Sequence, residues 1–525
     1  MEKKFVCTAD EPVVQSTAGK LRGFIYDGVY TFYGIKYADA ERFQAPVPPA
    51  AWEGVQDAVN YGYVCPMSGN PAPKSELYIP HRFWPSNEHC QYLNIWSPTL
   101  EPGARKPVMV WFHGGGFSSG SSIEQVAYEG DSLAKREDVV VVTVNHRLNI
   151  LGFLDMSSFG EKYRNSVNAG MADLVAALRW IRDNIAGFGG DPGNVTIFGQ
   201  SGGGGKCEAL LQIPEADGLF HKAIMMSGIM PPSSAKPVDH RVIIEEMLRE
   251  LNIAPDRAEE LETVPYELLD RVYNRAAEKL HTSIQWGPVA NDWYLGDPLK
   301  VGFSEHAKKI PVIAGTVVAE FASRNELAAE NAMTEEEKLA AVEKAFGEDA
   351  GDVLGAFRKS YPGEDLNLIG KVDMIFRPST VEFIRKKAEV SCADAYLYVF
   401  AMKFDIKGGA YAWHCADIPF VFRNTARVPS AFVEGVTERL EDEMCGAWTS
   451  FAYTGNPNHP GLVRWDSYTE KTPVTMVFRR NSGALPDFDT ELMALLRKHS
   501  NETAESLLAG MMKKVTKGKE KEWIY

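Results

Sequence analysis

Short apolar runs rich in β-branched residues recur along the chain and alternate with stretches of helical periodicity. Near-continuous apolar runs are typical of strands that are buried on both faces, as in parallel sheets covered by helices. Between the second and third run, Leu174, Leu178 and Ile181 fall on one face of a predicted helix. The alternation therefore predicts an α/β fold with a mainly parallel central sheet flanked by helices. The predicted strands span residues 108–112, 139–144, 195–198, 223–226, 312–315, 395–400 and 474–478.

Helical spacing extends to five further stretches, while the N-terminal region shows a different pattern. Residues 1–60 contain short apolar segments broken by turn residues, which predicts antiparallel strands of the same domain. Neither a fixed repeat period nor a long Gly/Ser/Pro-rich tether divides the chain. The further predicted helices cover about 240–252, 266–280, 334–346, 438–453 and 489–499.

Composition and charge narrow the class of protein. The 525 residues include 55 Lys+Arg and 70 Asp+Glu, a net charge of −15. The chain therefore has no excess of basic residues of the kind that binds nucleic acid. No apolar run approaches the length of a membrane-spanning helix. The N-terminal apolar stretch is too short for a signal peptide, so we expect a cytoplasmic protein, although a secreted mature form stays open. The seven cysteines form no C-x-x-C pair, so neither a zinc site nor a disulfide scaffold is expected, and no metal is predicted.

The pattern G-x-S-x-G occurs twice, around Ser118 and around Ser201. A nucleophile elbow requires a strand that runs directly into the turn and a helix that leaves it. The predicted strand 195–198 leads straight to Ser201, whereas a His-Gly-Gly-Gly segment separates Ser118 from its strand. A phosphate-binding loop ending at Lys206 is rejected, because the template G-x-x-x-x-G-K-[ST] fails at both ends. Ser201 is therefore the predicted nucleophile, and Ser118 is a loop residue.

The predicted strand 108–112 is followed by His113 and then by the glycine triplet Gly114–Gly116. Glycines allow backbone N–H groups to approach a reacting oxygen without interference from a side chain. Together with the N–H of Gly202, just after the nucleophile, they are predicted to stabilise the oxyanion of a tetrahedral intermediate.

The base and the acid are expected on loops that follow later strands, in the order serine, acid, histidine. His414 lies in a loop after the run 395–400 and is the predicted base, with His459 in reserve. Glu320 lies past the carboxyl end of the run 312–315, where ligands gather in α/β sheets. Asp292 and Asp297 stay open as alternative acids.

Taken together, these motifs resemble the type-B carboxylesterase family, which includes cholinesterases and bacterial para-nitrobenzyl esterases. The likeness runs from about residue 13 to residue 470. It implies an α/β-hydrolase fold and hydrolysis of esters without a cofactor. Further segments that carry the resemblance are Phe32-x-Gly34-Ile35, Arg42-Phe43, Cys90-Gln91-Tyr92-Leu93-Asn94, Asn145-His146-Arg147-Leu148, Phe188-Gly189-Gly190-Asp191-Pro192 and the stretch 448–458.

The family motifs also assign roles to individual residues. The family motif G-T-x-x-x-E, whose last position is the triad acid, matches 315–320 and assigns Glu320. The family base motif H-x-x-[DE]-[ILV] matches 414–418 and assigns His414. The family oxyanion donors correspond to Gly115, Gly116 and Gly202. The pairs Arg42 with Glu88 and Arg147 with Asp173 correspond to the family's structural ion pairs.

Departures from the family pattern concern the substrate pocket. Gln200 stands where the family usually has Glu, which removes a negative charge and weakens any preference for cationic choline-like substrates. Gly202 replaces the usual Ala. Cys65 and Cys90 match the positions of the family's first disulfide, a bond that a reducing cytoplasm disfavours. The loop that they bracket contains Phe83 and Trp84, for which a substrate-pocket role and a packing role both stay open.

The sequence therefore predicts a serine carboxylesterase that forms an acyl-enzyme from apolar, aryl or short-chain esters. A non-catalytic interaction protein on the same fold and an acyltransferase or amidase with the same triad are the alternatives. At roughly 150 residues per domain the length suggests three or four domains. Because one active site must join Ser201 to His414, we predict a single domain over 1–525, with insertions that roof the site. The expected partner is a small-molecule ester substrate. The sequence leaves the oligomeric state open between a monomer and a dimer.

Overall fold

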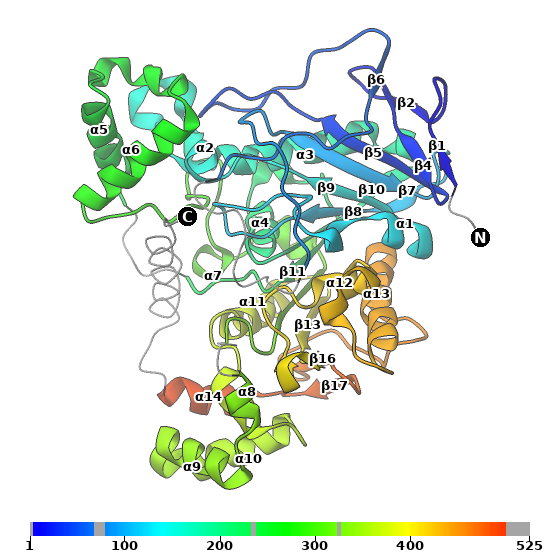
Figure 1. The fold of residues 1–525 in the computed structure, drawn as a ribbon, viewed down its shortest axis with the longest axis vertical. Helices are drawn as coiled ribbons and strands as arrows, with labels where there is room; N and C mark the ends of the chain where they lie inside the picture. Colours follow the sequence, from blue (N-terminus) through cyan, green and yellow to red (C-terminus); the bar gives the residue numbers. More distant parts are fainter. Residues whose placement is uncertain (1–3, 68–78, 233–237, 323–326, 500–525) are drawn as a thin grey trace. The chain divides into compact units, whose positions relative to one another are not determined.

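A computed structural model describes residues 4–67, 79–232, 238–322 and 327–499 of the chain. The chain forms two compact units, each with its own strands and helices (Figure 1). The first unit comprises Met1–Ala72, Pro80–Ile224 and Ser234–Ile310. The second comprises Pro73–Ile79, Met225–Ser233 and Pro311–Tyr525.

The first unit contains a sheet with parallel strands at one side and antiparallel strands at the other. β8 (Lys106–Phe112) pairs in parallel with β9 (Val140–Val144) and with β10 (Gly190–Gln200). The side chains of 108–112 are all fully buried, as expected for a strand that is covered on both faces. Beyond β9 the pairing is antiparallel through β7 (Tyr92–Ser97), β5 (Val29–Lys36), β4 (Phe24–Tyr26) and β1 (Phe5–Val6).

The N-terminal residues also form a separate small sheet. In it β2 (Val13–Gln15) pairs antiparallel with β3 (Lys20–Arg22), whereas β3 pairs in parallel with β6 (Val55–Asp57). Short strands thus recur through the N-terminal region, and most of their pairings are antiparallel.

Helices of the first unit follow the strands and also form an apolar cluster. α3 (Ala169–Asn184) buries Leu174, Leu178 and Ile181, the face expected from the spacing. α4 (Gly202–Leu210) follows β10 directly. α5 (His240–Glu250) and α6 (Tyr266–Lys279) pack on each other and bury an apolar cluster (Figure 1). The shorter helices are α1 (Asp131–Glu137), α2 (Asn149–Phe153) and α7 (Pro298–Val301).

The second unit is built on three parallel strands. β12 (Val312–Val317), β13 (Ala395–Phe400) and β16 (Val474–Phe478) pair in parallel, and β17 (Gly483–Pro486) adds an antiparallel edge. β14 (Lys403–Phe404) and β15 (Ala410–Tyr411) form a hairpin after β13. The chain passes from the first unit to the second within β11 (Lys222–Met226). The helices are α8 (Leu327–Asn331), α9 (Glu335–Phe346), α10 (Ala350–Ser360), α11 (Arg377–Val390), α12 (Ile418–Val421), α13 (Thr437–Thr454) and α14 (Thr490–His499).

Each of the seven predicted apolar runs forms a strand, and parallel pairs dominate around them. The prediction of an α/β fold with a mainly parallel sheet and flanking helices is therefore confirmed. β10 begins at Gly190, five residues before the expected start, because a register irregularity separates its polar first residues from the apolar run. The predicted helices agree with α3, α5, α6, α9, α13 and α14, whereas α10 and α11 were not expected.

A buried ion pair lies in the interior of each unit. In the first, Arg147 Nη2 lies 2.7 Å from Asp173 Oδ1, and both side chains are almost completely buried. In the second, Arg377 Nη2 lies 2.9 Å from Asp489 Oδ1, again with both side chains buried. The Arg147–Asp173 pair and a half-buried pair of Arg42 with Glu88 agree with the structural ion pairs that the resemblance implied.

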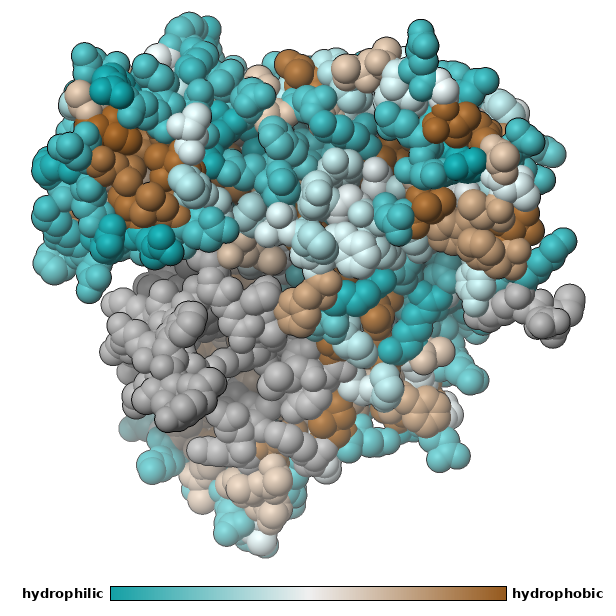
Figure 2. All heavy atoms as spheres, turned by 45° about the horizontal axis from the view of Figure 1, so that its top comes forward, coloured by the Kyte–Doolittle hydropathy of each residue, from teal (hydrophilic) through white to brown (hydrophobic). Residues whose placement is uncertain are grey.

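Within the described residues, no helix is both long enough and apolar enough to cross a bilayer. On the face shown in Figure 2, hydrophilic side chains predominate, and apolar side chains form separate small patches. Single exposed apolar side chains are normal for a folded protein and do not by themselves define a binding site.

Candidate active site

Ser201 lies at the turn between β10 and α4, in the first unit. Its backbone has φ 58° and ψ −127°, a strained conformation for a residue with a side chain. Such strain costs about 1–3 kcal/mol and is concentrated at active sites. A Cβ at Gly203 would overlap the carbonyl oxygen of Phe112 at the end of β8, so the elbow requires glycine there. The strand–turn–helix arrangement that the sequence indicated around Ser201 is therefore present.

The glycine loop after β8 packs directly against this elbow. A Cβ placed on Gly114 would lie 3.3 Å from the Cβ of Ser201, and one placed on Gly202 would overlap the carbonyl oxygen of Gly116. Gly115 and Gly116 have φ of 84° and 65°, which favour glycine. The structure thus brings Ser201 and Gly202 together with the loop that contains Gly115 and Gly116.

Hydrogen bonds to the loop carbonyls determine where its N–H groups point. His113 Nδ1 lies 2.9 Å from the carbonyl oxygen of Gly114, and the N–H of Ser119 donates to that of Gly115 at 3.1 Å. In a trans peptide the N–H of the next residue points opposite to the carbonyl. These bonds therefore fix the N–H groups of Gly115 and Gly116, the two donors expected from this loop.

The segment after the glycines is held by Asn149. Its N–H donates to the carbonyl of Phe117 at 2.8 Å, and its Nδ2 donates to the carbonyl of Ser118 at 3.2 Å. Ser118 lies in a turn rather than between a strand and a helix. The second G-x-S-x-G match is thus a turn in a loop and lacks the strand–turn–helix arrangement of the first.

Glu320 and His414 form a buried hydrogen-bonded pair in the second unit. His414 Nδ1 lies 2.6 Å from Glu320 Oε2, and the side chains are 6% and 1% exposed. The other carboxylate oxygen, Oε1, accepts the N–H of Val317 at 3.0 Å. The N–H of His414 also donates to the carbonyl of Glu320 at 2.8 Å. A carboxylate at Nδ1 selects the tautomer that carries its proton there, which leaves Nε2 as a base.

Aromatic rings fix the plane of the imidazole. The ring of Phe376 stacks on His414 at 7° with centroids 5.6 Å apart, and the Phe321 ring lies 4.4 Å away. Neither residue could be identified from the sequence, since neither stands in a motif that specifies contact with the histidine.

Two further buried carboxyls lie near Glu320. Burial, and then the charge of Glu320, raises the pKa of both Asp373 and Asp417 to about 7. Asp373 accepts the N–H of Arg377 at 2.7 Å, and Asp417 accepts the hydroxyl of Tyr398 at 3.0 Å. Both carboxyls are partly protonated near neutral pH, which limits the negative charge crowded around Glu320.

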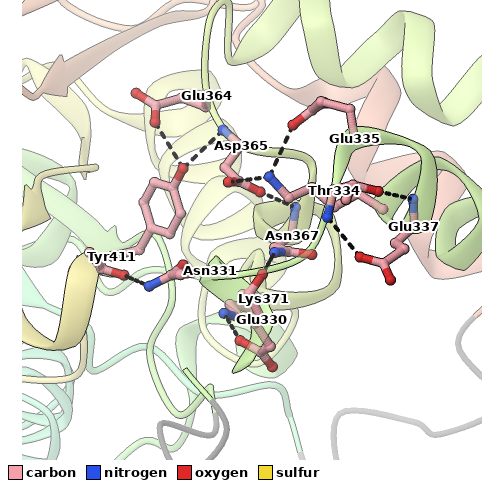
Figure 3. Close-up of polar contacts among 12 residues, drawn as sticks. Glu330, Asn331, Thr334, Glu335, Glu337, Glu364, Asp365, Asn367, Lys371 and Tyr411 are labelled. Carbon is pink, nitrogen blue, oxygen red and sulfur yellow. Dashed lines mark hydrogen bonds and ion pairs between the residues drawn. The ribbon is translucent and has the colours of Figure 1, made fainter. Parts of the chain in front are cut away.

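The hairpin that precedes His414 is anchored by the polar network of Figure 3. The hydroxyl of Tyr411 on β15 donates to Glu364 Oε2 at 2.9 Å and accepts the N–H of Asp365 at 3.1 Å. Asn331, the last residue of α8, donates from Nδ2 to the carbonyl of Gly409 at 3.0 Å. The chain three residues before His414 is therefore held by two other segments of the second unit.

The predicted site thus consists of two parts, one in each unit. Ser201, Gly115, Gly116 and Gly202 belong to the first unit, and Glu320 and His414 belong to the second.

The residues that the sequence left open as alternative base and alternative acids bind other partners in the structure. His459 lies with Nε2 at 3.0 Å from the carbonyl of Glu443 and accepts the N–H of Gly461 at Nδ1. Asp292 is largely exposed and pairs with Arg164, while Asp297 accepts the N–H of Leu299 at the start of α7. In contrast, a carboxylate partner is present at His414.

The expected pocket residues differ in their exposure. Gln200 is completely buried at the end of β10, whereas the side chains of Phe83 and Trp84 are 63% and 38% exposed. The ring of Trp84 packs edge-on against Tyr61 with centroids 5.4 Å apart. Phe83 is thus exposed rather than packed in the core.

Cys65 and Cys90 are both buried free thiols. Cys65 Sγ accepts the N–H of Leu148 at 3.3 Å, and burial raises the pKa of Cys90. The family disulfide between these positions is therefore not formed in this structure. No cluster of three or more His, Cys, Asp or Glu side chains among the described residues is arranged to hold a metal ion.

Comparisons with known proteins identify the family. The model of the carboxylesterase family matches residues 10–492, so the chain belongs to that family. It is 34% identical to the para-nitrobenzyl esterase of Bacillus subtilis (strain 168), over 89% of this chain and 94% of that protein. It is 31% identical to the phenmedipham hydrolase of Pseudarthrobacter oxydans, over 89% and 94% of the two chains.

Solved structures give the same result. An esterase from anaerobic Clostridium hathewayi, described as able to hydrolyse aliphatic aromatic polyesters, matches with a TM-score of 0.90 and 47% identity. The match covers 95% of this chain and 100% of that one. A thermophilic para-nitrobenzyl esterase matches with a TM-score of 0.74 and 32% identity, over 92% and 99% of the two chains. The fold is the α/β-hydrolase fold, and the protein is a carboxylic ester hydrolase, as predicted.

Proposed function

We propose that this carboxylic ester hydrolase acts through a triad of Ser201, His414 and Glu320 and an acyl-enzyme intermediate. The observation that carries the proposal is the 2.6 Å hydrogen bond between His414 Nδ1 and Glu320 Oε2. A histidine oriented in this way has its lone pair on Nε2, as a general base for a serine hydroxyl requires. The strained elbow at Ser201 and the glycine loop packed against it support the choice of nucleophile.

In the first half-reaction, Nε2 of His414 takes the proton of Ser201 Oγ as Oγ attacks the ester carbonyl carbon. The carbonyl oxygen becomes an oxyanion that accepts hydrogen bonds from the N–H groups of Gly115, Gly116 and Gly202. Collapse of the intermediate expels the alcohol, which receives the proton from His414. Water then attacks the acyl-enzyme by the same route and releases the acid.

This triad requires the two units to work as one α/β-hydrolase domain over 1–525, because the nucleophile lies in one unit and the acid and base lie in the other. Segments outside the central sheet then roof the substrate pocket. We also place the protein in the cytoplasm. The bacterial origin of the para-nitrobenzyl esterase relative is in keeping with this placement.

For the substrate we propose apolar, aryl or short-chain esters. Gln200 is neutral and buried next to Ser201, so it offers no charge to a cationic substrate. Phe83 and Trp84 expose aromatic surface and are assigned to the wall of the pocket. The names of the para-nitrobenzyl esterase and the polyester-hydrolysing relative are in keeping with aryl esters.

The test combines turnover with covalent labelling. The wild type should show a burst of 4-nitrophenol from 4-nitrophenyl acetate and should take up one organophosphate per chain on Ser201. Ser201→Ala should lose both, whereas the matched control Ser118→Ala should keep both. Turnover by Ser201→Ala, or a label elsewhere, would refute the triad. Release of free acid rather than transfer to an added alcohol separates the hydrolase from the acyltransferase alternative.

A further inference from the structure

Lys206 is a completely buried lysine on α4, five residues after the nucleophile. Its Nζ donates a hydrogen bond of 2.9 Å to the carbonyl oxygen of His113, the residue that precedes the glycine triplet. Its Nζ also lies 5.8 Å from the centre of the Phe117 ring, at the other end of the same loop. Lys206 therefore contacts the glycine loop from the helix that follows Ser201.

The hydrogen bond from Lys206 to His113 is one of three that hold consecutive carbonyl groups of the glycine loop. The carbonyls of Gly114 and Gly115 are held by His113 Nδ1 and by the N–H of Ser119. The carbonyl of His113 is the first of the three, and Lys206 holds it. Because carbonyl and N–H point in opposite directions across a trans peptide, this bond fixes the start of the loop.

The charges around Lys206 are few. Of the titratable groups that face it, Glu124, Cys65 and Cys207 favour its charged form. His113 and His146 stack on each other with centroids 5.2 Å apart, and burial, followed by the charge of Lys206, lowers the pKa of both. Both imidazoles are therefore neutral, and no ion pair to Lys206 is found among the residues that the structure describes.

Burying an ammonium without a paired carboxylate is costly, and a methionine would fill the same space without that cost. A buried ionisable group next to a reaction site is therefore a candidate for function. Lys206 contacts the glycine loop through the carbonyl of His113, and the N–H groups of that loop are assigned to bind the negatively charged oxyanion.

We propose that Lys206 is a positioning residue of the oxyanion site, which holds the His113 carbonyl and places a positive charge behind the glycine loop. The proposal rests on the proposed function, because it needs the oxyanion to form at Gly115, Gly116 and Gly202. The ammonium of Lys206 donates its hydrogen bond to the carbonyl of His113 and does not touch the substrate. It stabilises the oxyanion more than the neutral ester, so it acts on kcat rather than on KM.

The charge depends on pH. Burial, partly opposed by the charge of Glu124, lowers the pKa of Lys206 to about 7. The amine is charged below that pH and neutral above it, while the neutral amine still donates to His113. The contribution of the charge to kcat is therefore present below pH 7 and is lost as the pH rises above it.

The test compares Lys206→Met with the wild type, normalised by organophosphate titration of Ser201. At pH 6 we expect Lys206→Met to lose roughly tenfold in kcat with KM nearly unchanged, less than the loss of a direct oxyanion donor. Affinity for a trifluoromethyl ketone, which forms a tetrahedral oxyanion, should fall by the same factor. The ratio of wild-type to variant kcat should shrink as the pH rises from 6 to 8.5. Lys206→Arg keeps a charge at every pH, so the ratio of its kcat to that of Lys206→Met should stay constant as the pH rises from 6 to 8.5.

The matched control is Lys222→Met. Lys222 is also a buried lysine, and burial lowers its pKa to about 8, but its Nζ donates to Asn194, just before the part of β10 that pairs in continuous register with β8. Five residues of strand separate Val195 from Gln200, which is about 16 Å at the usual rise per residue. Lys222→Met should leave kcat, inhibitor affinity and the pH profile unchanged.

The melting temperature of Lys206→Met is the control that shows whether the variant folds. The pKa of Lys206 is about 7 in the folded protein against an ordinary 10.5, so the unfolded chain binds more protons between these values. Lys206→Met avoids this cost and should melt above the wild type at pH 6, with the difference vanishing towards pH 10.5.

The outcomes separate the two proposals. If Ser201→Ala is inactive but Lys206→Met keeps wild-type kcat, inhibitor affinity and pH profile, the assignment of Lys206 is wrong and the triad stands. If Lys206→Met loses kcat equally at every pH, or Lys222→Met has the same effect, the role of the charge is likewise refuted. If Ser201→Ala keeps turnover, the triad itself fails.

Discussion

At the scale of single residues, the acid–base pair shows how one carboxylate can hold a histidine. Both oxygens of Glu320 are engaged, one by His414 Nδ1 and the other by the N–H of Val317, so the carboxylate has little freedom to rotate. Both groups are buried, and the stacked ring of Phe376 restricts the imidazole plane. A charge in such surroundings is weakly screened and stabilises an imidazolium strongly.

We therefore expect Glu320→Gln to reduce kcat by about a thousandfold or more, with little change in KM. The amide has nearly the same shape but carries no charge, and its NH₂ group can select the wrong histidine tautomer. Steady-state kinetics with a 4-nitrophenyl ester measure both constants. Glu364→Gln is the control, because it keeps an oxygen for the Tyr411 hydroxyl, and it should stay within about twofold of the wild type. A Glu320→Gln variant with near wild-type kcat would contradict the role of the acid.

At the scale of elements, the close approach of β8, β10 and α4 forms the elbow around the proposed nucleophile. The first turn of α4 touches the end of β8 so closely that Gly203 has no room for a side chain. The same contact brings the loop after β8 against Ser201. Glycine is needed here for space, whereas Gly355 of α10 is exposed, and a methyl group added there would meet no other atom within 4 Å.

These two helical glycines should respond in opposite ways to the same substitution. Gly203→Ala should lower the melting temperature and the activity together, because the Cβ would overlap the carbonyl of Phe112 and displace the elbow. Gly355→Ala should stabilise the protein by up to about 1 kcal/mol, because alanine restricts the unfolded chain more and favours the helix. Thermal melts and esterase assays of both variants measure this. Equal stability changes in the two variants would contradict the packing argument.

At the scale of the whole molecule, the proposed reaction draws groups from two compact units. The nucleophile with its glycine loop belongs to one, and the acid–base pair belongs to the other. Each unit also contains its own buried ion pair, Arg147 with Asp173 and Arg377 with Asp489. These pairs are independent probes of how each unit unfolds.

Arg147→Met and Arg377→Met should each destabilise the protein by about 3–5 kcal/mol, because each leaves a buried carboxylate unpaired. If 1–525 is one cooperative domain, either variant shifts a single transition that fluorescence, circular dichroism and loss of activity report alike. Denaturant unfolding followed by these three probes is the measurement. Two separate transitions, of which each variant moves only one, would show that the units unfold as separate domains.

The sequence by itself determined much of the fold, and it singled out the residues that the proposed site uses. Apolar runs buried on both faces specify parallel strands locally, and all seven predicted strands are present. The elbow could be predicted because its requirements, a strand, small flanking residues and a helix, are contiguous in the chain. Glu320 and His414 were predicted from their places after strands, with other acids and another histidine left open until the resemblance to the family favoured these two. Of the longer helices, α10 and α11 were missed: the periodic signal of α11 is weak, whereas α10 does have a regular apolar face that buries Val353, Ala356 and Phe357.

Only the tertiary structure decided which distant groups meet. The Glu320–His414 bond joins residues 94 apart, and the Lys206–His113 bond joins residues 93 apart. In the sequence Lys206 stands out only as part of a rejected phosphate motif, and nothing in its local pattern indicates burial against a carbonyl. Local patterns specify the elements, because periodicity and turn chemistry act over a few residues. Which charge lies behind which loop depends on how the elements pack, because Coulomb and hydrogen-bond energies depend on distance in space rather than along the chain.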